Sequence, residues 1–339
     1  MSSVRKILLK QKNRMLLTGI LLLALLIVLA VLMMTIGSKI YTPAEVLEIL
    51  KSPGTKGAAF TIKTLRLPKT VIGILAGFAF GMSGYTFQTI LHNPLASPDI
   101  IGITSGSSVA AVFCILILGI SGPFVSAMSI ISGLAVTIFI MLLSGKKKAF
   151  GTRMILIGIG TQAILNALIS WMLLKGSEYD VASALRWLRG SLGMVTLSDI
   201  PMLLAITIPA AALLLFLERS ISLLSLGEEY PVTLGLNAGK MRLAAACLGL
   251  LLSAGATAVT GPVASVAFLS GPISSKLAKG TRSSLLLSGL TGAILVLAGE
   301  LLGQNAFATR YPVGVITGLL GAPYLLMMLV FLNKKGAKT

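Results

Sequence analysis

Few side chains in this sequence could perform acid–base, nucleophilic or metal chemistry. Its 339 residues include one histidine (His92), two cysteines (Cys114 and Cys247) and ten acidic residues. Transition-metal sites are built from clustered Cys, His and carboxylate ligands, and the sequence contains no such cluster. It also lacks a Ser/His/Asp arrangement and a pair of carboxylates within an apolar run. We therefore expect no catalytic residue, no bound metal and no cofactor.

A nucleotide-binding site is not expected either. The segment nearest to a phosphate-binding loop, residues 235–241 (GLNAGKM), has the wrong glycine spacing and lacks the Ser or Thr that would bind magnesium. The chain is therefore predicted not to be an enzyme, and any energy from ATP would have to come from another subunit.

Acidic residues inside membrane helices are typical of ion-coupled carriers. Here the acidic residues fall mainly at predicted helix ends and in loops, and only Glu300 could lie within an apolar segment. We favour an interfacial carboxylate paired with a loop base such as Arg310, and a proton relay is the alternative. An ion-coupled secondary transporter is accordingly the less favoured class.

The most informative spacing belongs to glycines and prolines. Gly73, Gly77 and Gly81 recur every four residues and so share one face of a helix, which would let another helix backbone approach closely in a bilayer. The same apolar run is then broken by Asn93 and Pro94. Irregular backbone at membrane depth is tolerated only where protein buries it or where it lines a water-filled cavity. This pattern predicts a translocation path rather than a simple anchor.

A second interruption occurs in the other half of the chain, in the segment 261–275 (GPVASVAFLSGPISS). Interrupted apolar segments at corresponding places in two halves point to the transport site of carriers built from repeats. We expect the path backbone to include the break residues of both halves: Asn93, Pro94, Pro98, Gly102, Gly261 and Pro262.

These residues must be positioned by membrane helices. The chain is 55% hydrophobic and 11% charged, with a mean hydropathy of +0.96, whereas soluble domains carry about 25% charged residues. The apolar runs do not alternate, so they are not barrel strands. We predict an all-α polytopic membrane protein, a single transmembrane domain over residues 1–339, whose first helix is retained rather than cleaved. The ten predicted spans are residues 15–37, 67–91, 101–120, 124–143, 153–174, 200–217, 241–260, 263–277, 284–303 and 313–332.

The charges predict the orientation. Ten crossings put both termini on one side, and a cytoplasmic N-terminus leaves 18 of the 28 basic residues on the cytoplasmic side, as the positive-inside rule requires. We therefore predict a multi-pass protein of the cytoplasmic membrane with both termini in the cytoplasm. Basic loops facing anionic membrane lipid account for most of the net charge of +18. No nucleic-acid partner is expected.

Two connections could contact partners. The predicted cytoplasmic loop 218–242 is too long for a simple turn, and a short helix within it could either dock in a groove of a cytoplasmic protein or lie on the chain's own surface. On the outer side, Arg66 and Lys69 flank the start of the second span. From the residues alone, ordinary interfacial anchors are the favoured interpretation of this pair.

Six segments of the sequence resemble the permease subunits of binding-protein-dependent ABC importers of the iron–siderophore and vitamin B12 (FecCD-type) family. They follow the family's order from about residue 40 to the end of the chain. The segments are RLPKT at 66–70, GMSGYTFQTILHNPLASPDIIGITSGSS at 81–108, RWLRGSLG at 186–193, LGLNAGKMRL at 234–243, GPVASVAF at 261–268 and YPVGVITGLLGAPYLLMML at 311–329.

The resemblance implies the type II ABC importer permease architecture, with about ten helices per subunit. It implies a second permease subunit, two cytoplasmic ATPase subunits and an extracytoplasmic substrate-binding protein. It also implies that the loop aligned with 225–240 couples the permease to the ATPase. The expected coupling residues are Leu234, Gly235 and Leu236, with Glu228 in the same loop.

The resemblance also implies a docking site for the binding protein, where basic residues of the RLPKT motif meet acidic residues. This makes Arg66 and Lys69 candidates, although Lys69 lacks the forked geometry of the arginine found in many relatives. Gln304 stands where an outer arginine is common, and Arg310 could substitute for it. Residues 271–276 (GPISSK) depart from the family's usual Pro-His-x-x-Arg or Pro-Gln-x-x-Arg pattern.

The implied function is the permease subunit of an ATP-driven importer of iron–siderophore complexes. The segments 93–102 and 321–324 resemble the siderophore branch, in which two different permeases often pair, so a heterodimer is favoured over a homodimer. A permease for cobalamin or haem is the alternative within the family.

Overall fold

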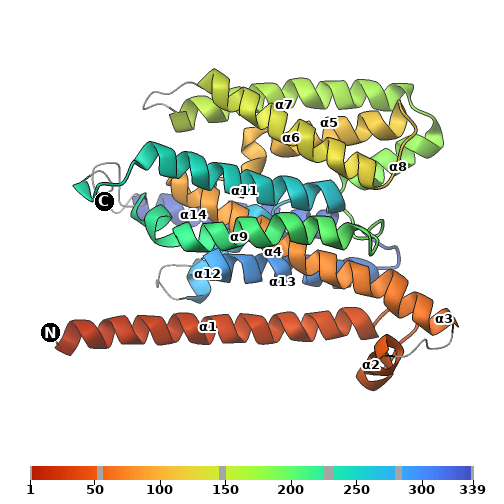
Figure 1. Ribbon diagram of the computed structural model, residues 1–339, viewed down its shortest axis with the longest axis horizontal. Helices are drawn as coiled ribbons and strands as arrows, with labels where there is room; N and C mark the ends of the chain where they lie inside the picture. The colour runs from red at the N-terminus through yellow and green to blue at the C-terminus, as the bar shows by residue number, and fades with distance from the viewer. Residues whose placement is uncertain (1, 52–55, 145–149, 225–232, 279–284, 337–339) are drawn as a thin grey trace.

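The structure is a computed structural model that describes residues 2–51, 56–144, 150–224, 233–278 and 285–336. Within these residues every regular element is a helix (Figure 1). The elements are α1 Ser2–Thr35, α2 Pro43–Lys51, α3 Lys56–Ala59, the π-helix η1 Phe60–Arg66, α4 Leu67–Ile90, the 3₁₀-helix η2 Pro98–Ile101, α5 Ile103–Leu116, α6 Pro123–Ser144, α7 Phe150–Lys175, α8 Glu178–Leu188, α9 Asp199–Leu224, α11 Ala238–Thr260, α12 Val266–Leu277, α13 Leu285–Asn305 and α14 Val313–Gly336.

Each of the ten predicted spans corresponds to one helix of the structure. These helices are α1, α4, α5, α6, α7, α9, α11, α12, α13 and α14. Seven helices in the described part of the chain are long and apolar enough to cross a membrane by themselves. The prediction of an all-α, multi-pass membrane protein is confirmed. Four short elements of the connections 38–66 and 175–199, namely α2, α3, η1 and α8, were not predicted.

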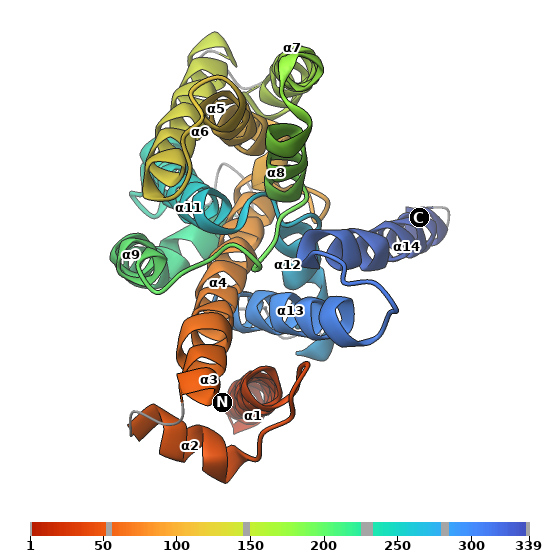
Figure 2. The same cartoon turned by 90° about the vertical axis from the view of Figure 1, so that its right-hand side faces the viewer.

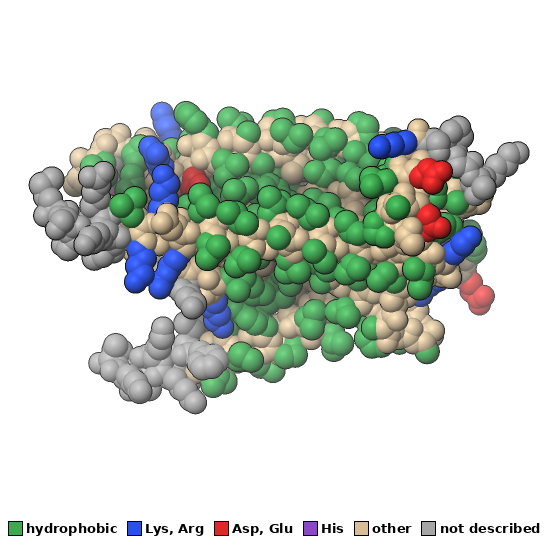
Figure 3. All heavy atoms as spheres, turned by 90° about the horizontal axis from the view of Figure 1, so that it is seen from below, with side chains coloured by type: hydrophobic (Ala, Val, Ile, Leu, Met, Phe, Trp, Pro, Cys, Tyr) green, Lys and Arg blue, Asp and Glu red, His purple; other side chains and the backbone are tan. Residues whose placement is uncertain are grey.

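The helices run roughly along one axis, and α1 begins at the same end at which α14 finishes, on the left of Figure 1. Figure 2 shows α4 near the middle of the bundle, between a group formed by α5, α6 and α7 and another that contains α13 and α1. In the face drawn in Figure 3, apolar side chains form a band between two ends at which charged side chains gather. This arrangement fits a bilayer around the middle of the bundle.

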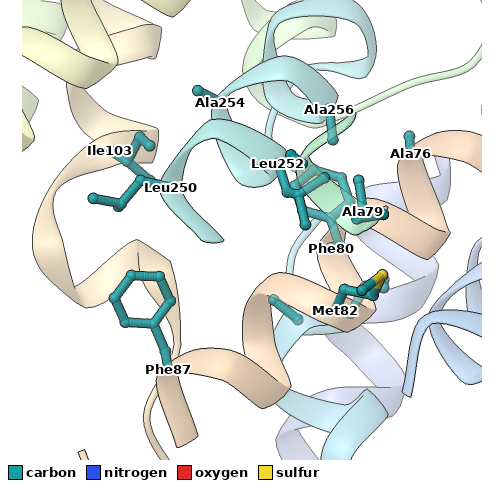
Figure 4. Packing of buried hydrophobic residues seen from close by; sticks show 14 of the residues in the cluster. Ala76, Ala79, Phe80, Met82, Phe87, Ile103, Leu250, Leu252, Ala254 and Ala256 are labelled. Carbon is teal, nitrogen blue, oxygen red and sulfur yellow. The ribbon is translucent and has the colours of Figure 1, made fainter. Parts of the chain in front are cut away.

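The core lies around α4 and its neighbours. Phe80, Met82 and Phe87 of α4 are buried near Leu250 and Leu252 of α11 (Figure 4). Because lipid tails are as apolar as these side chains, close packing rather than removal from water must hold such helices together. The fit in shape between the surfaces of neighbouring helices therefore determines which helices α4 contacts.

The glycine face of α4 supplies that shape. A Cβ atom at Gly77 would lie 2.6 Å from Ala293 Cα of α13, and one at Gly81 would lie 2.2 Å from the Ser288 carbonyl oxygen. On the facing helix, a Cβ at Gly292 would lie 2.1 Å from the Gly77 oxygen. The predicted close approach of a second helix is confirmed, and α13 is that helix.

Two short helices begin with hydrogen-bonded caps. At α2, the Thr42 amide donates to Glu45 Oε2 at 2.7 Å, and the Glu45 amide donates to Thr42 Oγ1 at 3.3 Å. At α8, the Asp180 amide donates to Ser177 Oγ at 3.3 Å. The hydrogen bonds from the Thr42 amide and hydroxyl lower the pKa of Glu45. The reciprocal bonds at α2 form a capping box, whereas Ser177 is a simple N-cap of α8. Both are visible in the sequence, as Thr-x-x-Glu and Ser-x-x-Asp.

Candidate functional site

The first interruption separates α4 from α5. Asn93 accepts the Leu95 amide on its side-chain oxygen at 2.9 Å and the Ala96 amide on its carbonyl oxygen at 3.0 Å, which closes a turn that contains Pro94. Gly102 then adopts φ +78° where α5 begins. A Cβ there would lie 2.7 Å from Ile140 Cδ1, the end of a side chain that can rotate, so it is the backbone conformation that favours glycine.

The second interruption separates α11 from α12. Gly261 has φ +69°, and Ser265, which precedes α12, has φ +67°. The Ser191 amide donates to the Thr260 oxygen at 2.7 Å, so the freed end of α11 is bonded by the connection after α8. Protein contacts therefore satisfy backbone that the break would otherwise expose.

Neither helix that follows a break can span the bilayer alone. At 1.5 Å per residue, α5 (14 residues) and α12 (12 residues) reach only about 21 and 18 Å, against about 30 Å of hydrocarbon. A helix this short crosses the hydrocarbon only if irregular backbone beside it also lies within the membrane. The six predicted path residues, Asn93, Pro94, Pro98, Gly102, Gly261 and Pro262, lie in the irregular segments that precede α5 and α12. Their position in the membrane and their role in lining a path stay predictions.

The structure brings three distant sequence motifs into contact at the second break. A Cβ at Gly261 would lie 2.2 Å from the Trp187 oxygen, and one at Gly190 would lie 2.2 Å from the Pro262 oxygen. The Gly314 amide at the start of α14 donates to the Gly190 oxygen at 3.1 Å. The segments 186–193, 261–268 and 311–318 thus meet through their backbones, and the glycines allow the approach.

The first break contacts the end of α9. His92 has φ +52°, and its Nε2 lies 2.7 Å from the carbonyl oxygen of Leu224, the last residue of α9. An imidazole N–H at this point satisfies a carbonyl that the helix end leaves without an intrahelical partner. The only histidine of the sequence therefore joins the first break to the helix that precedes the predicted coupling loop.

The predicted coupling residues lie at the end of the bundle where α9 finishes and α11 begins (Figure 1). Leu234 is 64% exposed, and Gly235 has φ +75° with no atom of the described residues within 4 Å of its Cβ position. Leu236 is half-buried, and α11 follows, capped by Asn237, whose side-chain oxygen accepts the Lys240 amide at 3.0 Å. Glu228 lies outside the described residues. The coupling role stays a prediction.

At the opposite end, Arg66 is directed into the protein. Its Nη1 donates to the Met34 oxygen at 2.8 Å and its Nη2 donates to the Lys39 oxygen, while the guanidinium lies 5.3 Å from the Tyr41 ring centroid. These carbonyls belong to the last turn of α1 and the segment that follows it. Arg66 thus joins α1 to η1, a contact that the sequence analysis missed because it spans about thirty residues.

A cavity of about 240 Å³ opens beside Arg66, between the ends of α1, η1 and α13. Its lining includes Lys69, Arg310 and Glu300, the last only 1% exposed. Glu300 Oε1 accepts Gln304 Nε2 at 3.1 Å, whereas Arg310 Nη2 donates to Ser38 Oγ at 2.7 Å. The expected pairing of Glu300 with Arg310 is therefore wrong: Arg310 bonds Ser38, Gln304 bonds only Oε1 of the carboxylate, and the buried Oε2 has no hydrogen-bond partner among the described residues.

The three basic residues predicted to dock a binding protein, Arg66, Lys69 and Arg310, thus line one cavity. The structure brings them together from two distant parts of the chain. Their docking role stays a prediction, and Arg66 has in addition the structural contacts described above.

Loss of the Arg66 hydrogen bonds is expected to lower the stability of the protein. Arg66→Gln should lower the free energy of unfolding by about 1–3 kcal/mol, because buried carbonyl groups lose their donors. The measurement is the melting midpoint of the purified protein in detergent. Arg310→Gln, which removes an exposed hydrogen bond in the same cavity, is the control and should shift the midpoint little. A normal midpoint for Arg66→Gln would contradict the structural role.

The fold and the breaks together define a class of protein: a polytopic membrane protein with interrupted helices. The family model of the FecCD transport family matches residues 22–331. The chain is 29% identical to the ferric enterobactin transport system permease protein FepG of Escherichia coli, over 95% of this chain and 98% of that protein. It is 33% identical to the Fe(3+)-citrate import system permease protein YfmE of Bacillus subtilis, over 96% and 98%.

The fold has a solved counterpart. A metal-chelate type ABC transporter in an inward-facing conformation superposes with a TM-score of 0.81 and 26% identity, covering 92% of this chain and 98% of that chain. The chain therefore belongs to the FecCD transport family, the group of ABC importer permeases that work with ATPase subunits, substrate-binding proteins and a second permease subunit.

Proposed function

We propose that this chain is the permease subunit of an ATP-driven importer that carries iron–siderophore complexes across the cytoplasmic membrane. The match to the FecCD family over residues 22–331 carries the proposal, supported by the iron-chelate permeases among its relatives. ATP is hydrolysed by a separate subunit. Both termini lie in the cytoplasm, where 18 of the 28 basic residues also fall.

The proposed cycle begins at the outer end. A loaded binding protein docks over the cavity lined by Arg66, Lys69 and Arg310, whose charges attract acidic residues on its lobes. ATP binding closes the two ATPase subunits at the other end, and the loop around Gly235 transmits that closure to the helix bundle. The chelate then passes between this chain and a second, different permease.

Iron is cargo in this scheme and arrives wrapped by its chelator. Transport therefore requires no metal ligands from the permease, and backbone and small residues at the two breaks suffice to shape a path. Most of the specificity is then expected in the binding protein.

Purification of the tagged chain from native membranes in detergent tests the proposal. We expect an ATPase and a second, different permease to copurify, and the reconstituted complex to take up ferric siderophore when ATP is inside the vesicles and loaded binding protein outside. Copurification of the ATPase with uptake of cobalamin or haem instead would support the other branch of the family. Uptake that needs no ATPase and collapses with the proton gradient would show an ion-coupled carrier.

Charge reversal in the cavity tests the docking site. Lys69→Glu should weaken binding of the substrate-binding protein about tenfold or more at low salt, because a local attraction becomes a repulsion. The measurement is the dissociation constant for the binding protein at two ionic strengths. Lys175→Glu makes the same charge change on α7, outside the cavity, and should change binding little. Equal effects of the two variants would show that binding depends only on the overall charge of this end of the protein and not on the cavity.

A further inference from the structure

Three of the described helices, α9, α12 and α14, have a proline in their interior. Pro272 is the one in α12, Val266–Leu277, the helix that follows the second break. Proline has no backbone N–H, so the carbonyl four residues earlier, that of Phe268, cannot receive its usual intrahelical hydrogen bond. Phe268 is 8% exposed, and a buried carbonyl without a donor is costly. Another group must supply the missing donor.

A side chain of α4 supplies it. Gln88 Nε2 donates to the Phe268 oxygen at 2.9 Å, although the two residues are 180 positions apart. Gln88 is 9% exposed, so its amide is enclosed between the two helices. The donor that Pro272 removes from α12 is therefore replaced by one from α4.

The neighbouring glycine makes room for this bond. A Cβ at Gly271 would lie 2.0 Å from Gln88 Oε1, so any other residue there would displace the amide. One turn earlier on α4, a Cβ at Gly84 would lie 1.8 Å from the Ala267 oxygen, which shows how closely the two backbones approach. Gly271 and Pro272 together thus form a receiving site for the Gln88 side chain.

Gln88 is also hydrogen-bonded, through its backbone, to the first break. The Asn93 amide donates to the Gln88 carbonyl oxygen at 3.1 Å. The backbone of Gln88 thus anchors the turn after α4, while its side chain anchors the helix that follows the second break. One residue of α4 is therefore hydrogen-bonded to both interrupted segments.

We propose that Gln88 is a positioning residue for transport, whose side-chain amide replaces the N–H missing at Pro272 and makes α12 move with the end of α4. A proline-containing helix can bend at the freed carbonyl, and here the donor that covers this carbonyl belongs to another helix. Movement at the first break is therefore transmitted to α12. The functional part of this proposal rests on the proposed transport activity.

A double-mutant cycle tests the hydrogen bond. Gln88→Leu removes the donor at similar volume, and Pro272→Ala restores a backbone N–H for the Phe268 oxygen. In the purified importer, Gln88→Leu should lower the melting midpoint by a few degrees with Pro272 present, on the order of 2–4 °C for each 1 kcal/mol lost, and should have little effect in the Pro272→Ala background. Equal shifts in the two backgrounds would overturn the assignment. This readout needs no substrate, so it holds even if the proposed cargo is wrong.

The role of Gln88 in transport is tested by a separate measurement, that of uptake together with ATP hydrolysis. Gln88→Leu should lower uptake about tenfold and raise the ATP hydrolysed per substrate imported, because α12 no longer follows α4. Gly271→Ala should reproduce both effects by displacing the amide. Thr89→Ala, which removes only an intrahelical bond to the Tyr85 oxygen, is the control and should change neither. An unchanged ratio of ATP to substrate in Gln88→Leu would overturn the positioning role.

Discussion

Replacing Gly235 by glutamate is expected to abolish uptake while the protein still inserts and folds. Gly235 has φ +75°, a conformation that costs most other residues on the order of 1–2 kcal/mol. Among the described residues, no atom lies within 4 Å of its Cβ position, so the first atom of a new side chain meets nothing in the described bundle. Both the strain and the new charge act on the exposed surface that includes Leu234, where the ATPase is proposed to dock.

Three measurements on one preparation separate the possible causes: abundance in the membrane, copurification of the ATPase and ATP-dependent uptake. We expect normal abundance, weaker ATPase association and loss of uptake by more than about a hundredfold, since a docking contact that misaligns also loses coupling. Normal uptake in this variant would show that the loop is not the coupling element.

The chain offers a matched control for this variant. Gly119 also has a positive φ, of +63°, and no atom within 4 Å of its Cβ position, but it lies in the connection between α5 and α6 at the opposite end of the bundle. Gly119→Glu should leave uptake close to that of the unmodified protein. Gly235→Asn tolerates the left-handed conformation and adds no charge, so it should retain more uptake than Gly235→Glu.

The long elements could be predicted because their signal is local. An apolar run identifies a span wherever it stands, and the spacing of Gly73, Gly77 and Gly81 predicts a close helix contact without saying which helix makes it. The capping residues Thr42 and Ser177 give an equally local signal. They identify α2 and α8, but short amphipathic helices carry little hydropathy signal, so a search for spans passes over them.

The contacts that join distant segments could not be predicted from one sequence. Arg66 looks like an interfacial anchor until the end of α1 is placed beside it, and Gln88 looks like a polar residue near a helix end until Pro272 faces it. In both cases the partner is a backbone carbonyl, and a carbonyl has no signature in the sequence. Pro272 alone of these residues indicates such a contact in the sequence, because a proline in the interior of a helix leaves a carbonyl without its usual backbone donor.

Gly81→Ala is expected to be among the most damaging small substitutions in the bundle. The added Cβ would lie 2.2 Å from the Ser288 carbonyl oxygen, 2.9 Å from its carbonyl carbon and 3.1 Å from Gly289 Cα. All three are backbone atoms of α13, so no side chain can rotate away and the two helices must separate. Overpacking of this kind costs about 1–3 kcal/mol and more where backbone must move.

The same substitution at Gly160 is the matched control. Gly160 lies on α7, exposed and with no atom within 4 Å of its Cβ position. Because alanine is the better helix former, Gly160→Ala should stabilise the protein by up to about 1 kcal/mol. The two variants should therefore shift the melting midpoint in detergent in opposite directions. A raised melting midpoint for both variants would mean that helix propensity outweighs packing at Gly81. In that case the glycine face of α4 would not be what brings α4 and α13 together.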